Sequence, residues 1–555
     1  MASETKITFL GGLGDIGRNC MALETEGKLL ILDCGQLFAG YDRPGVDAIL
    51  PDLDYLMQRA DSIVGMIATH GHEDHIGAIA YLFKAGVKFP IYSSEFTLGM
   101  IGHRLAEAGH LKGAEFNKVA DGETHQIGPF SVEFLPVTHS IPNGLISAIT
   151  TPQGVVLHSS DLKLDPDPVD GRLTDLDRIA EISEDPGIRM LLCDSTNANQ
   201  EGKSLSETDI GPVLEDVFAD NEGRRIICAA FSSHIHRVQQ MVDAAQAHGR
   251  TIATLGLSMK RNVGLARELG VLDLPDRDFI DIADIDDYAD GDLLIISTGS
   301  QGEARAALAQ ASLGRNKWIN FTDNDTVILS STAIPGNEEA VANMINRIMR
   351  VGARVVHSGQ QDVHTSGHGK RGELALLHEA ANAEWFVPVH GEEQHMRAHM
   401  DLAWELGMDQ DRVLLARDGD QVSLTDGGAK VHRQITPGTH MLVHGNFVGP
   451  DRGVVEERII LQNAGMVSAI VTVDFEDRVM LGAPVVISRG WLDTPQLSSL
   501  HAEIASEVSD WVAKALREKD VEPENVRRAV RKATGQYVND RSRRRPMIVP
   551  VVIEA

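Results

Sequence analysis

Four side chains of types that bind metal ions follow directly after an apolar run. This combination constrains the fold more than any other feature of the chain. The run at 62–68 has the length of a buried strand, and His70, His72, Asp74 and His75 then fall within six positions. Imidazole nitrogens and carboxylate oxygens are the ligands that zinc-like ions prefer. A polar loop that only caps the helix expected at 76–83 is the simpler alternative, but this density of ligands disfavours it.

The same arrangement recurs along the chain. Strands predicted at 28–32, 131–137, 154–158 and 384–389 are followed closely by Asp33, His139, Asp161 and His390. A lone histidine after a strand is usually structural, but five strand ends that carry metal-type residues form a constellation. The sequence therefore predicts a metal centre at the carboxyl edge of α/β sheets, where such folds place their sites.

These residues resemble the metallo-β-lactamase superfamily, whose HxHxDH signature matches residues 70–75. The resemblance implies two divalent ions per chain, zinc first and manganese as the alternative. One ion would be held by His70, His72 and His139 and the other by Asp74, His75 and His390, with Asp161 bridging them and Asp33 orienting the ligands from behind. Members of the superfamily hydrolyse lactams, thioesters, lactones and nucleic acids, so the metal site does not select the substrate.

More than two hundred residues separate Asp161 from His390, too many for a loop. Strand-like runs at 225–231, 251–255, 292–297, 326–330 and 354–357 alternate with helical patterns such as 236–248 and 338–351, which predicts an inserted parallel α/β domain. The insertion resembles the β-CASP branch of the superfamily, the nucleases, whose three motifs match the segments at 191–198, 363–368 and 388–392. The segments 10–19, 231–237 and 297–303 narrow the resemblance to the bacterial ribonuclease J family.

This resemblance implies a metal-dependent ribonuclease that acts on single-stranded RNA in RNA maturation and decay, including rRNA processing and mRNA decay. Asp74, Asp194 and His368 would be catalytic: Asp74 orienting the attacking water, Asp194 orienting ligands, and His368 stabilising the scissile phosphate or protonating the leaving 3′-oxygen. A pocket for a 5′-monophosphate would favour 5′-to-3′ exonuclease activity with some endonuclease activity. Its residues would be Ser233, His234, Ile235, His236, His364, Thr365, Ser366, Gly367 and His368.

Two positions depart from the pattern of the family. His234 stands where asparagine is commoner, and Thr365 replaces a commoner valine. Neither residue is an expected metal ligand. Both departures fall in segments that are expected to contact the substrate phosphate.

Two alternatives to the ribonuclease remain open. One is a small-molecule metallo-hydrolase of the lactonase or thioesterase type, and the other is an RNA-binding scaffold without catalysis. A third, a nicotinamide site, is suggested by the GxGxxG spacing of Gly12, Gly14 and Gly17. That motif requires a helix to follow, whereas residues 19–32 predict a hairpin, so we expect no nicotinamide cofactor.

Composition limits the remaining possibilities. The formal net charge of −29 disfavours RNA as a partner at first sight, but bound cations and a basic zone at 527–545 can supply positive charge locally. A solvated helix face explains that zone equally well. No apolar stretch is long enough for a membrane span and no signal-peptide layout is present, so we expect a cytoplasmic protein without a membrane partner.

We expect an α/β fold with three parts: a metallo-β-lactamase αββα sandwich, an inserted parallel α/β β-CASP domain and a small C-terminal α+β domain. The expected boundaries are 1–210 and 351–445 for the sandwich, 211–350 for the insertion, 446–465 for a linker and 466–555 for the C-terminal domain. Short strands are expected at 414–417 and 421–424. The resemblance implies that the C-terminal domain supports self-association as a homodimer or homotetramer.

Overall fold

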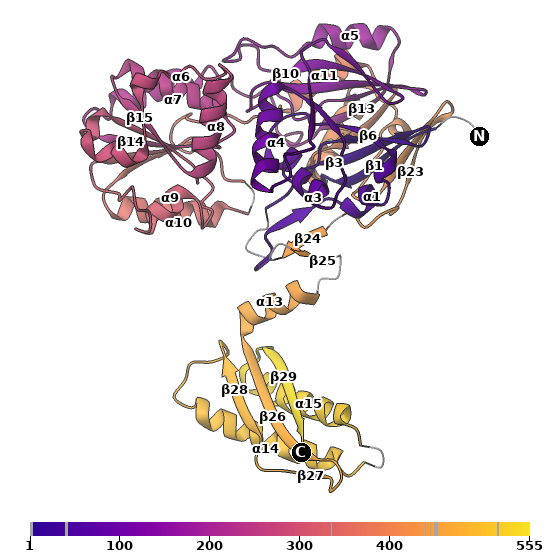
Figure 1. Cartoon of the computed structure of the whole chain (residues 1–555), viewed down its shortest axis with the longest axis vertical. Helices are drawn as coiled ribbons and strands as arrows, with labels where there is room; N and C mark the ends of the chain where they lie inside the picture. Colours follow the sequence, from indigo (N-terminus) through magenta and orange to yellow (C-terminus); the bar gives the residue numbers. More distant parts are fainter. Residues whose placement is uncertain are drawn as a thin grey trace. The chain divides into compact units, whose positions relative to one another are not determined.

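The structure is a computed structural model that describes residues 4–38, 43–334, 336–438, 440–443, 446–448, 453–518 and 521–555. They form two compact units. The first contains Met1–Phe38 and Ala48–Met441, and the second contains Ala39–Asp47 and Leu442–Ala555. Figure 1 shows the C-terminal part of the second unit in orange to yellow.

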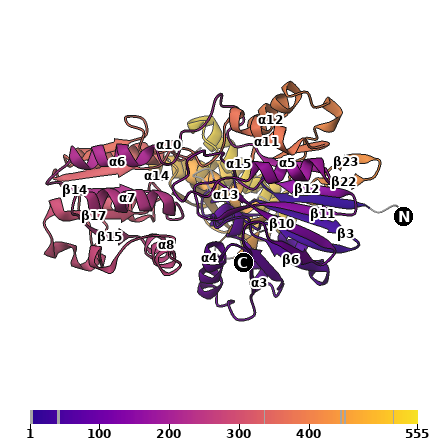
Figure 2. The same ribbon diagram turned by 90° about the horizontal axis from the view of Figure 1, so that it is seen from above.

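Two sheets form the centre of the first unit (Figure 2). The first sheet has the order β23 (Gly428–His432), β22 (Gln421–Thr425), β1 (Thr5–Gly11), β3 (Cys20–Thr25), β4 (Lys28–Leu32), β6 (Ile63–Ile67), β7 (Pro90–Ser93) and β8 (Glu115–Lys118). The second has the order β20 (Trp385–Val389), β13 (Ile188–Asp194), β12 (Gly154–His158), β11 (Gly144–Thr151), β10 (Phe130–Val137) and β9 (Thr124–Ile127). β3 and β4 are antiparallel, as the predicted hairpin requires.

The core lies between these two sheets. Phe9 and Leu30 from the first sheet belong to one buried cluster with Phe134 and Val156 from the second. A fully buried side chain of this size contributes about 1.5–3 kcal/mol. Helices α3 (Ile79–Lys84) and α4 (Glu95–Glu107) lie outside the first sheet, and α5 (Leu176–Glu184), α11 (Arg371–Ala381) and α12 (Glu393–Glu405) pack on the second. The result is the expected αββα sandwich.

A third, all-parallel sheet forms the inserted part. Its order is β16 (Phe279–Ile280), β15 (Thr251–Leu255), β17 (Leu293–Ser297), β14 (Arg225–Ala229), β18 (Asp325–Leu329) and β19 (Arg354–His357). Its helices are α6 (Ile210–Ala219), α7 (Ile235–Ala247), α8 (Leu257–Glu268), α9 (Ala307–Ser312) and α10 (Glu338–Arg350), and they cover both faces (Figure 1). The strands are buried on both sides, which explains their nearly unbroken apolar runs.

The strands bring the predicted ligands to one edge of the sandwich. β12, β13 and β20 are mutually parallel, and β10 runs in the same direction because both β10 and β12 are antiparallel to β11. In the other sheet β4 and β6 are parallel. At this edge Asp33, Ser160 and His390 have positive φ angles of 57°, 59° and 50°. Such backbone costs about 1–3 kcal/mol per residue and clusters at functional sites.

The structure corrects several local predictions. The helix expected at 76–83 is divided into α2 (Glu73–Ile76) and α3, because Gly77 and Ala78 lie between them. The predicted strand at 414–417 is wrong: only Val413 forms a bridge there, with Phe386. Residues 446–465, predicted as a linker, contain β25 (Asn446–Val448) and the 12-residue helix α13 (Gly453–Ala464).

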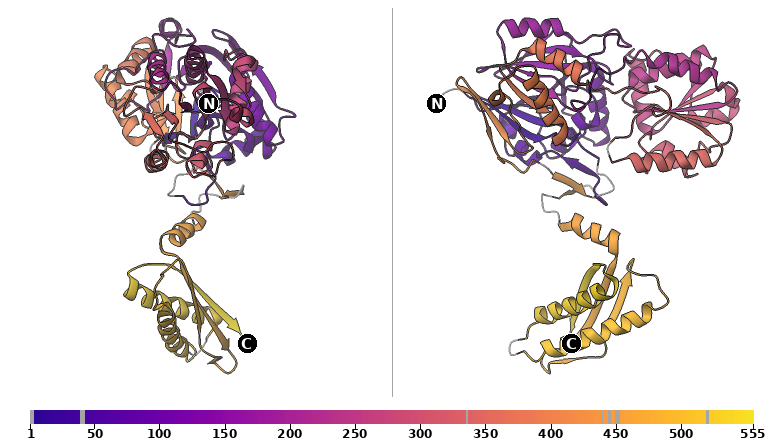
Figure 3. Two further views of the ribbon diagram at one scale, coloured as in Figure 1. Left: turned by 90° about the vertical axis from the view of Figure 1, so that its left-hand side faces the viewer. Right: turned by 180° about the vertical axis from the view of Figure 1, so that it is seen from behind.

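The second unit is an α+β structure (Figure 3). β26 (Met466–Asp474) pairs with β27 (Val479–Met480), β28 (Val485–Arg489) and the terminal β29 (Met547–Glu554). Val467, Val471 and Val473 on one face of β26 pack in a core with side chains of α14 (Leu497–Ala515) and α15 (Pro523–Ser542). The basic zone lies on α15 and the segment after it, where Arg528, Arg531 and Arg543–Arg545 are exposed. None of the helices in the described ranges has the length and apolar character needed to cross a membrane.

Candidate metal centre

Three imidazole nitrogens and one carboxylate oxygen converge at the edge of the sandwich. His72 Nδ1 lies 3.1 Å from His70 Nε2 and 3.2 Å from His139 Nε2. Asp161 Oδ2 lies 3.6 Å from His70 Nε2 and 3.7 Å from His139 Nε2. Four such atoms around one point are a typical ligand set for a divalent ion.

A second set shares Asp161 and lies directly beside the first. Asp161 Oδ2 is 3.2 Å from His75 Nε2, and Asp74 Oδ2 is 3.7 Å from the same nitrogen and 3.3 Å from His390 Nε2. Asp74, His75, Asp161 and His390 therefore form another group with ligand atoms within 4.8 Å of one another. Because Asp161 Oδ2 belongs to both groups, the two ligand sets could hold two adjacent ions with Asp161 between them.

The bridging carboxylate itself fits the binding of cations. Asp161 Oδ1 is buried and lies 3.4 Å from His390 Nδ1, an ion pair that does not have hydrogen-bond geometry. A buried carboxylate is costly unless positive charge neutralises it, and bound cations would supply that charge. These donors therefore suit a pair of divalent ions.

Asp33 holds the ligand turn from behind. Its Oδ2 lies 2.7 Å from His75 Nδ1, and its Oδ1 and Oδ2 accept hydrogen bonds of 2.8 Å from Thr69 N and Thr69 Oγ1. A carboxylate on the far nitrogen of a histidine fixes the ring and leaves the other nitrogen for the metal. Asp33 thus lies where the sequence predicted an orienting residue.

The electrostatics of the two groups differ. Burial and neighbouring imidazoles lower the pKa values of His70 and His139, and burial lowers that of His72 to about 4, which leaves these rings in the neutral form that binds metal. In the other group, burial is outweighed by Asp161 and its neighbouring carboxylates, which raise the pKa of His390 to about 10 and that of His75 well above its usual value. This half of the centre attracts positive charge strongly.

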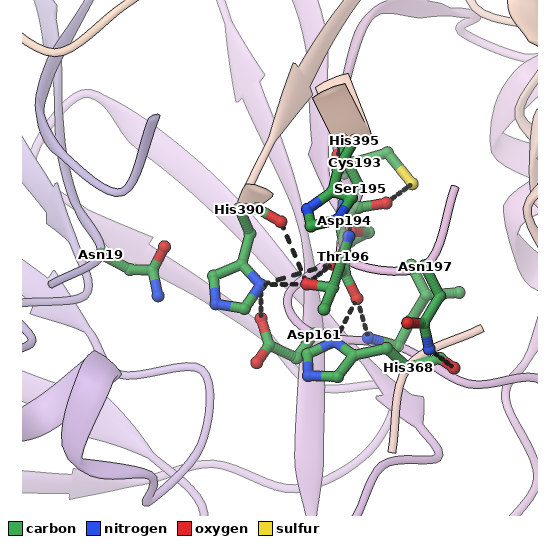
Figure 4. Close-up of polar contacts among 12 residues, drawn as sticks. Asn19, Asp161, Cys193, Asp194, Ser195, Thr196, Asn197, His368, His390 and His395 are labelled. Atoms are coloured by element: carbon green, nitrogen blue, oxygen red, sulfur yellow. Dashed lines mark hydrogen bonds and ion pairs between the residues drawn. The ribbon is translucent and has the colours of Figure 1, made fainter. Parts of the chain in front are cut away.

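His368 and Asp194 form a pair beside the second group (Figure 4). His368 Nδ1 lies 2.7 Å from Asp194 Oδ2, and the rings of His368 and His390 are stacked with centroids 5.3 Å apart. Burial alone would lower the pKa of His368, but Asp194 outweighs it and raises that pKa. Asp194 Oδ1 accepts hydrogen bonds from Thr196 N and Thr196 Oγ1, and Thr196 Oγ1 lies 2.9 Å from His390 Nδ1.

The segment that carries His368 is attached to the sandwich and to the inserted part. Asn197 Nδ2 donates to Ser366 Oγ at 2.8 Å and to the His368 carbonyl at 2.9 Å. On the other side, Arg237 of α7 is completely buried and donates to the Val363 carbonyl at 2.7 Å. The same guanidinium is paired with Glu207 at 2.6 Å. The sandwich therefore holds His368 directly, and Arg237 of the insertion holds the chain at Val363, five residues before it.

The predicted phosphate-binding residues are brought together only in part. Ile235 is fully buried in the insertion, and His234 is nearly buried with its Nε2 3.2 Å from Glu207 Oε1. His236 Nε2 lies 3.1 Å from Asp170 Oδ2, and Thr365 Oγ1 donates to the Leu205 carbonyl. The half-buried residues of the set are Ser233, His236, His364, Ser366, Gly367 and His368. A cavity of about 20 Å³, room for about one water, is lined by His236, Ser366 and Gly367 beside His139.

Sequence reasoning missed several residues that support the centre, among them Thr196, Asn197, Glu207 and Arg237. Asn197 and Thr196 follow Asp194 directly, and a polar run after a strand end was the available signal. Arg237 lies on α7, a helix that also buries Val238 and Met241, and a charged side chain buried in such a helix indicates a buried partner. Nothing in the sequence identifies Glu207 as that partner.

Comparison with known protein families covers most of the chain. Residues 13–195 match the metallo-beta-lactamase superfamily, 223–348 the ribonuclease J beta-CASP domain, 352–412 a Zn-dependent metallo-hydrolase RNA specificity domain and 453–555 the ribonuclease J C-terminal domain. Among solved structures, a protein of unknown function from Enterococcus faecalis covers 76% of this chain with a TM-score of 0.52 and 15% identity. That likeness concerns the fold alone.

Curated relatives match over the full length. Ribonuclease J of Mycolicibacterium smegmatis is 42% identical over 551 residues, which cover 99% of this chain and 97% of the relative. Ribonuclease J of Mycobacterium tuberculosis strain H37Rv is 41% identical with the same coverage, and that of Corynebacterium glutamicum is 39% identical over all of this chain and 76% of the relative. With the αββα sandwich, the inserted β-CASP domain and the C-terminal domain all in place, the chain belongs to the ribonuclease J family.

Proposed function

We propose that this protein is a metal-dependent ribonuclease that hydrolyses RNA phosphodiesters, mainly as a 5′-to-3′ exonuclease and to a lesser extent as an endonuclease. The observation that carries the proposal is the juxtaposition of two ligand sets, joined at Asp161, with the His368–Asp194 pair. The relatives named ribonuclease J support the substrate class. Zinc is the ion that the histidine-rich donors favour, with manganese as the alternative.

The chemistry assigns a role to each group. Bound divalent ions would supply positive charge for the phosphate and lower the pKa of the attacking water. Asp74 orients that water. His368 donates a proton to the leaving 3′-oxygen, because Asp194 keeps its ring oriented and its pKa raised. Cleavage of the P–O3′ bond leaves the phosphate on the remaining RNA, so each cycle produces a new 5′-monophosphate end.

Recognition of that end is proposed for the residues between the sandwich and the insertion. Ser233 comes from the insertion, and His364, Ser366 and Gly367 lie on the segment between β19 and His368. Hydroxyls, imidazoles and backbone amides suit a terminal phosphate, and charge-assisted hydrogen bonds to a dianion are about twice as strong as neutral ones. A pocket that closes around the monophosphate would exclude the larger triphosphate. Preference for a monophosphorylated end follows from both features.

The alternatives have less support. A lactonase or thioesterase on this metal centre needs neither the inserted domain nor the Arg237 and Asn197 contacts that hold the His368 segment. An RNA-binding scaffold without catalysis would not need all seven ligand positions, and every one of them is present and converges. Hydrolysis of a chromogenic ester compared with labelled RNA separates these candidates.

The experiment that tests the proposal compares one RNA with a 5′-monophosphate or a 5′-triphosphate. We expect faster release of mononucleotides from the monophosphorylated RNA. In the Ser233→Ala/Ser366→Ala protein we expect slower exonucleolysis and little remaining preference, with internal cleavage retained because the metal ligands are unchanged. An unaltered preference in that variant would place the pocket elsewhere, and products that begin only at internal sites would contradict the exonuclease.

A further inference from the structure

Asn19, the residue before β3, lies against the turn that carries two ligands of the second group. Its backbone N–H donates to the Asp74 carbonyl at 2.8 Å, and its side-chain Nδ2 donates to the same oxygen at 3.2 Å. Nδ2 also lies 3.0 Å from His75 Nε2, the nitrogen that faces the centre. The residue is 6% exposed. Figure 4 shows it on the side of His390 that faces away from Asp194.

Two glycines allow this close approach. A Cβ atom on Gly35 would lie 1.6 Å from the Asp74 carbonyl oxygen, and one on Gly12, which has a φ of 97°, would lie 2.5 Å from Asn19 Oδ1. Gly35 N donates to the Asn19 carbonyl at 2.9 Å, and Cys34 N donates to the His75 carbonyl at 2.7 Å. Three backbone segments therefore meet at Asn19, with no room for additional side chains.

The loop that presents Asn19 is itself fixed. Arg18 is nearly buried, and its Nη1 lies 2.7 Å from Asp418 Oδ2 while its Nη2 lies 2.8 Å from Asp15 Oδ2. Asp418 Oδ1 accepts a hydrogen bond from Leu13 N at 2.9 Å. The neighbouring short strand β2 (Leu13–Gly14) pairs with β21 (Gly391–Glu392), directly after His390. The loop therefore has little freedom to move relative to either side of the second group.

The contacts of Asn19 concern one ligand group only. They reach Asp74 and His75, whereas within the described residues Asn19 has no bond to His70, His72 or His139. We propose that Asn19 is a positioning residue for a single ion site: its bonds to the Asp74 carbonyl hold the turn that carries Asp74 and His75 in its binding geometry before the ion arrives. The inference rests on the proposed two-ion centre. Loss of such an orienting contact typically costs 10–100-fold in metal affinity.

The test measures ion binding without RNA. Metal-free protein is titrated with Zn²⁺ by calorimetry for the wild type, Asn19→Ala and Asn19→Leu, the last of which has the same branched shape but no donor. We expect one of two binding constants to weaken by about 10–100-fold in both variants and the other to stay unchanged. His139→Ala removes a ligand of the first group. It should weaken the binding constant that the Asn19 variants leave unchanged.

The control is Asn221→Ala, since Asn221 is equally buried and donates to the Val217 carbonyl at 2.7 Å but lies in the insertion. It should keep both constants. Circular dichroism verifies that each variant is folded. If Asn19→Ala is unfolded, the test is made with Asn19→Leu. Wild-type binding in Asn19→Leu would overturn the inference, as would equal weakening of both sites. If the wild type does not bind two ions, the proposed centre itself fails.

Discussion

His368 is the residue whose surroundings best define a chemical role, because it touches Asp194 and stacks on His390 but belongs to neither main ligand set. If His368 is the proton donor, His368→Ala should lower the turnover by about 10²-fold or more and leave the metal content unchanged. Exposed His248 provides the matched control, and His248→Ala should keep full activity. Rate assays combined with metal analysis distinguish this role from that of a ligand: loss of an ion in His368→Ala would assign His368 to the metal.

The Asp194 carboxylate gives a second prediction at the same scale. Asp194 raises the pKa of His368, so the protonated, donating form persists to higher pH than for an ordinary histidine. In Asp194→Asn the pKa of His368 should fall, and the alkaline limb of the pH–rate profile should move to lower pH. An alkaline limb that stays in place would show that His368 is not the titrating group.

Single residues also mark the limit of sequence reasoning. The ligands between His70 and His75 were predictable because several metal-type side chains share one short turn, and His139 and Asp161 because they follow strands. Thr196 and Asn197 stand in a polar run after a strand end, whereas Asn19 carries no such signal, and only folding brings all three to the centre. The positive φ angles at Asp33 and His390 were likewise not predictable, because glycine is the usual sequence sign of such an angle and neither residue is glycine.

At the scale of elements, a buried histidine pair joins α11 and α12. His378 Nε2 lies 3.0 Å from His399 Nε2, and His399 Nδ1 lies 3.0 Å from Ser195 Oγ, next to Asp194. Burial lowers the pKa of His378 to about 4, below the 6.5 of an unfolded histidine. Its contribution to stability is therefore complete above pH 6.5 and is lost as the pH falls toward 4.

This linkage is measurable by urea unfolding at pH 7 and pH 5. The titration of His378 should account for about 2 kcal/mol of the stability lost between these pH values. In His378→Gln, which keeps a donor for His399, the loss should be smaller by about that amount, whereas His248→Gln on the surface should behave like the wild type. If stability depended on pH identically in all three proteins, the pKa of His378 would not be lowered by folding.

Patterns of apolar residues predicted most elements well, since β4, β12, β15 and β19 have the expected bounds. The failures have physical reasons. Residues 414–417 resemble a strand, but the Leu414 N–H only meets the carbonyl of Phe386 and no ladder follows. Helix α13 lies after a Gly- and Pro-containing stretch that indicated a linker, and its mixed apolar and charged residues gave no clear periodicity.

For the whole molecule, the second unit raises the question of self-association. On the face of its sheet opposite α14 and α15, Val485 and Ile487 of β28 and Ile553 of β29 are 57%, 43% and 47% exposed. Apolar side chains grouped on one open sheet face favour contact with another protein surface. If the protein forms the proposed dimer or tetramer through this face, Val485→Glu/Ile487→Glu should lower the mass measured by light scattering to that of a monomer.

Leu313→Glu supplies the comparison, because Leu313 is 41% exposed but belongs to the insertion. It should leave the mass unchanged. A double variant with the wild-type assembly would exclude this face as the interface. The comparison is needed because the formal charge is already −29, so added carboxylates increase repulsion between copies wherever they are placed. Only loss of the interface should distinguish the two variants.

The central claim is that RNA hydrolysis depends on two ions held by seven side chains, of which Asp161 belongs to both ligand groups. The most direct measurement titrates metal-free protein with Zn²⁺ or Mn²⁺ while bound ions and hydrolysis of a 5′-monophosphorylated RNA are followed together. The account predicts that hydrolysis appears only as two ions per chain are bound, and that folded Asp74→Ala/His75→Ala binds fewer ions and remains inactive. Hydrolysis by metal-free protein, or full activity of that variant, would contradict it.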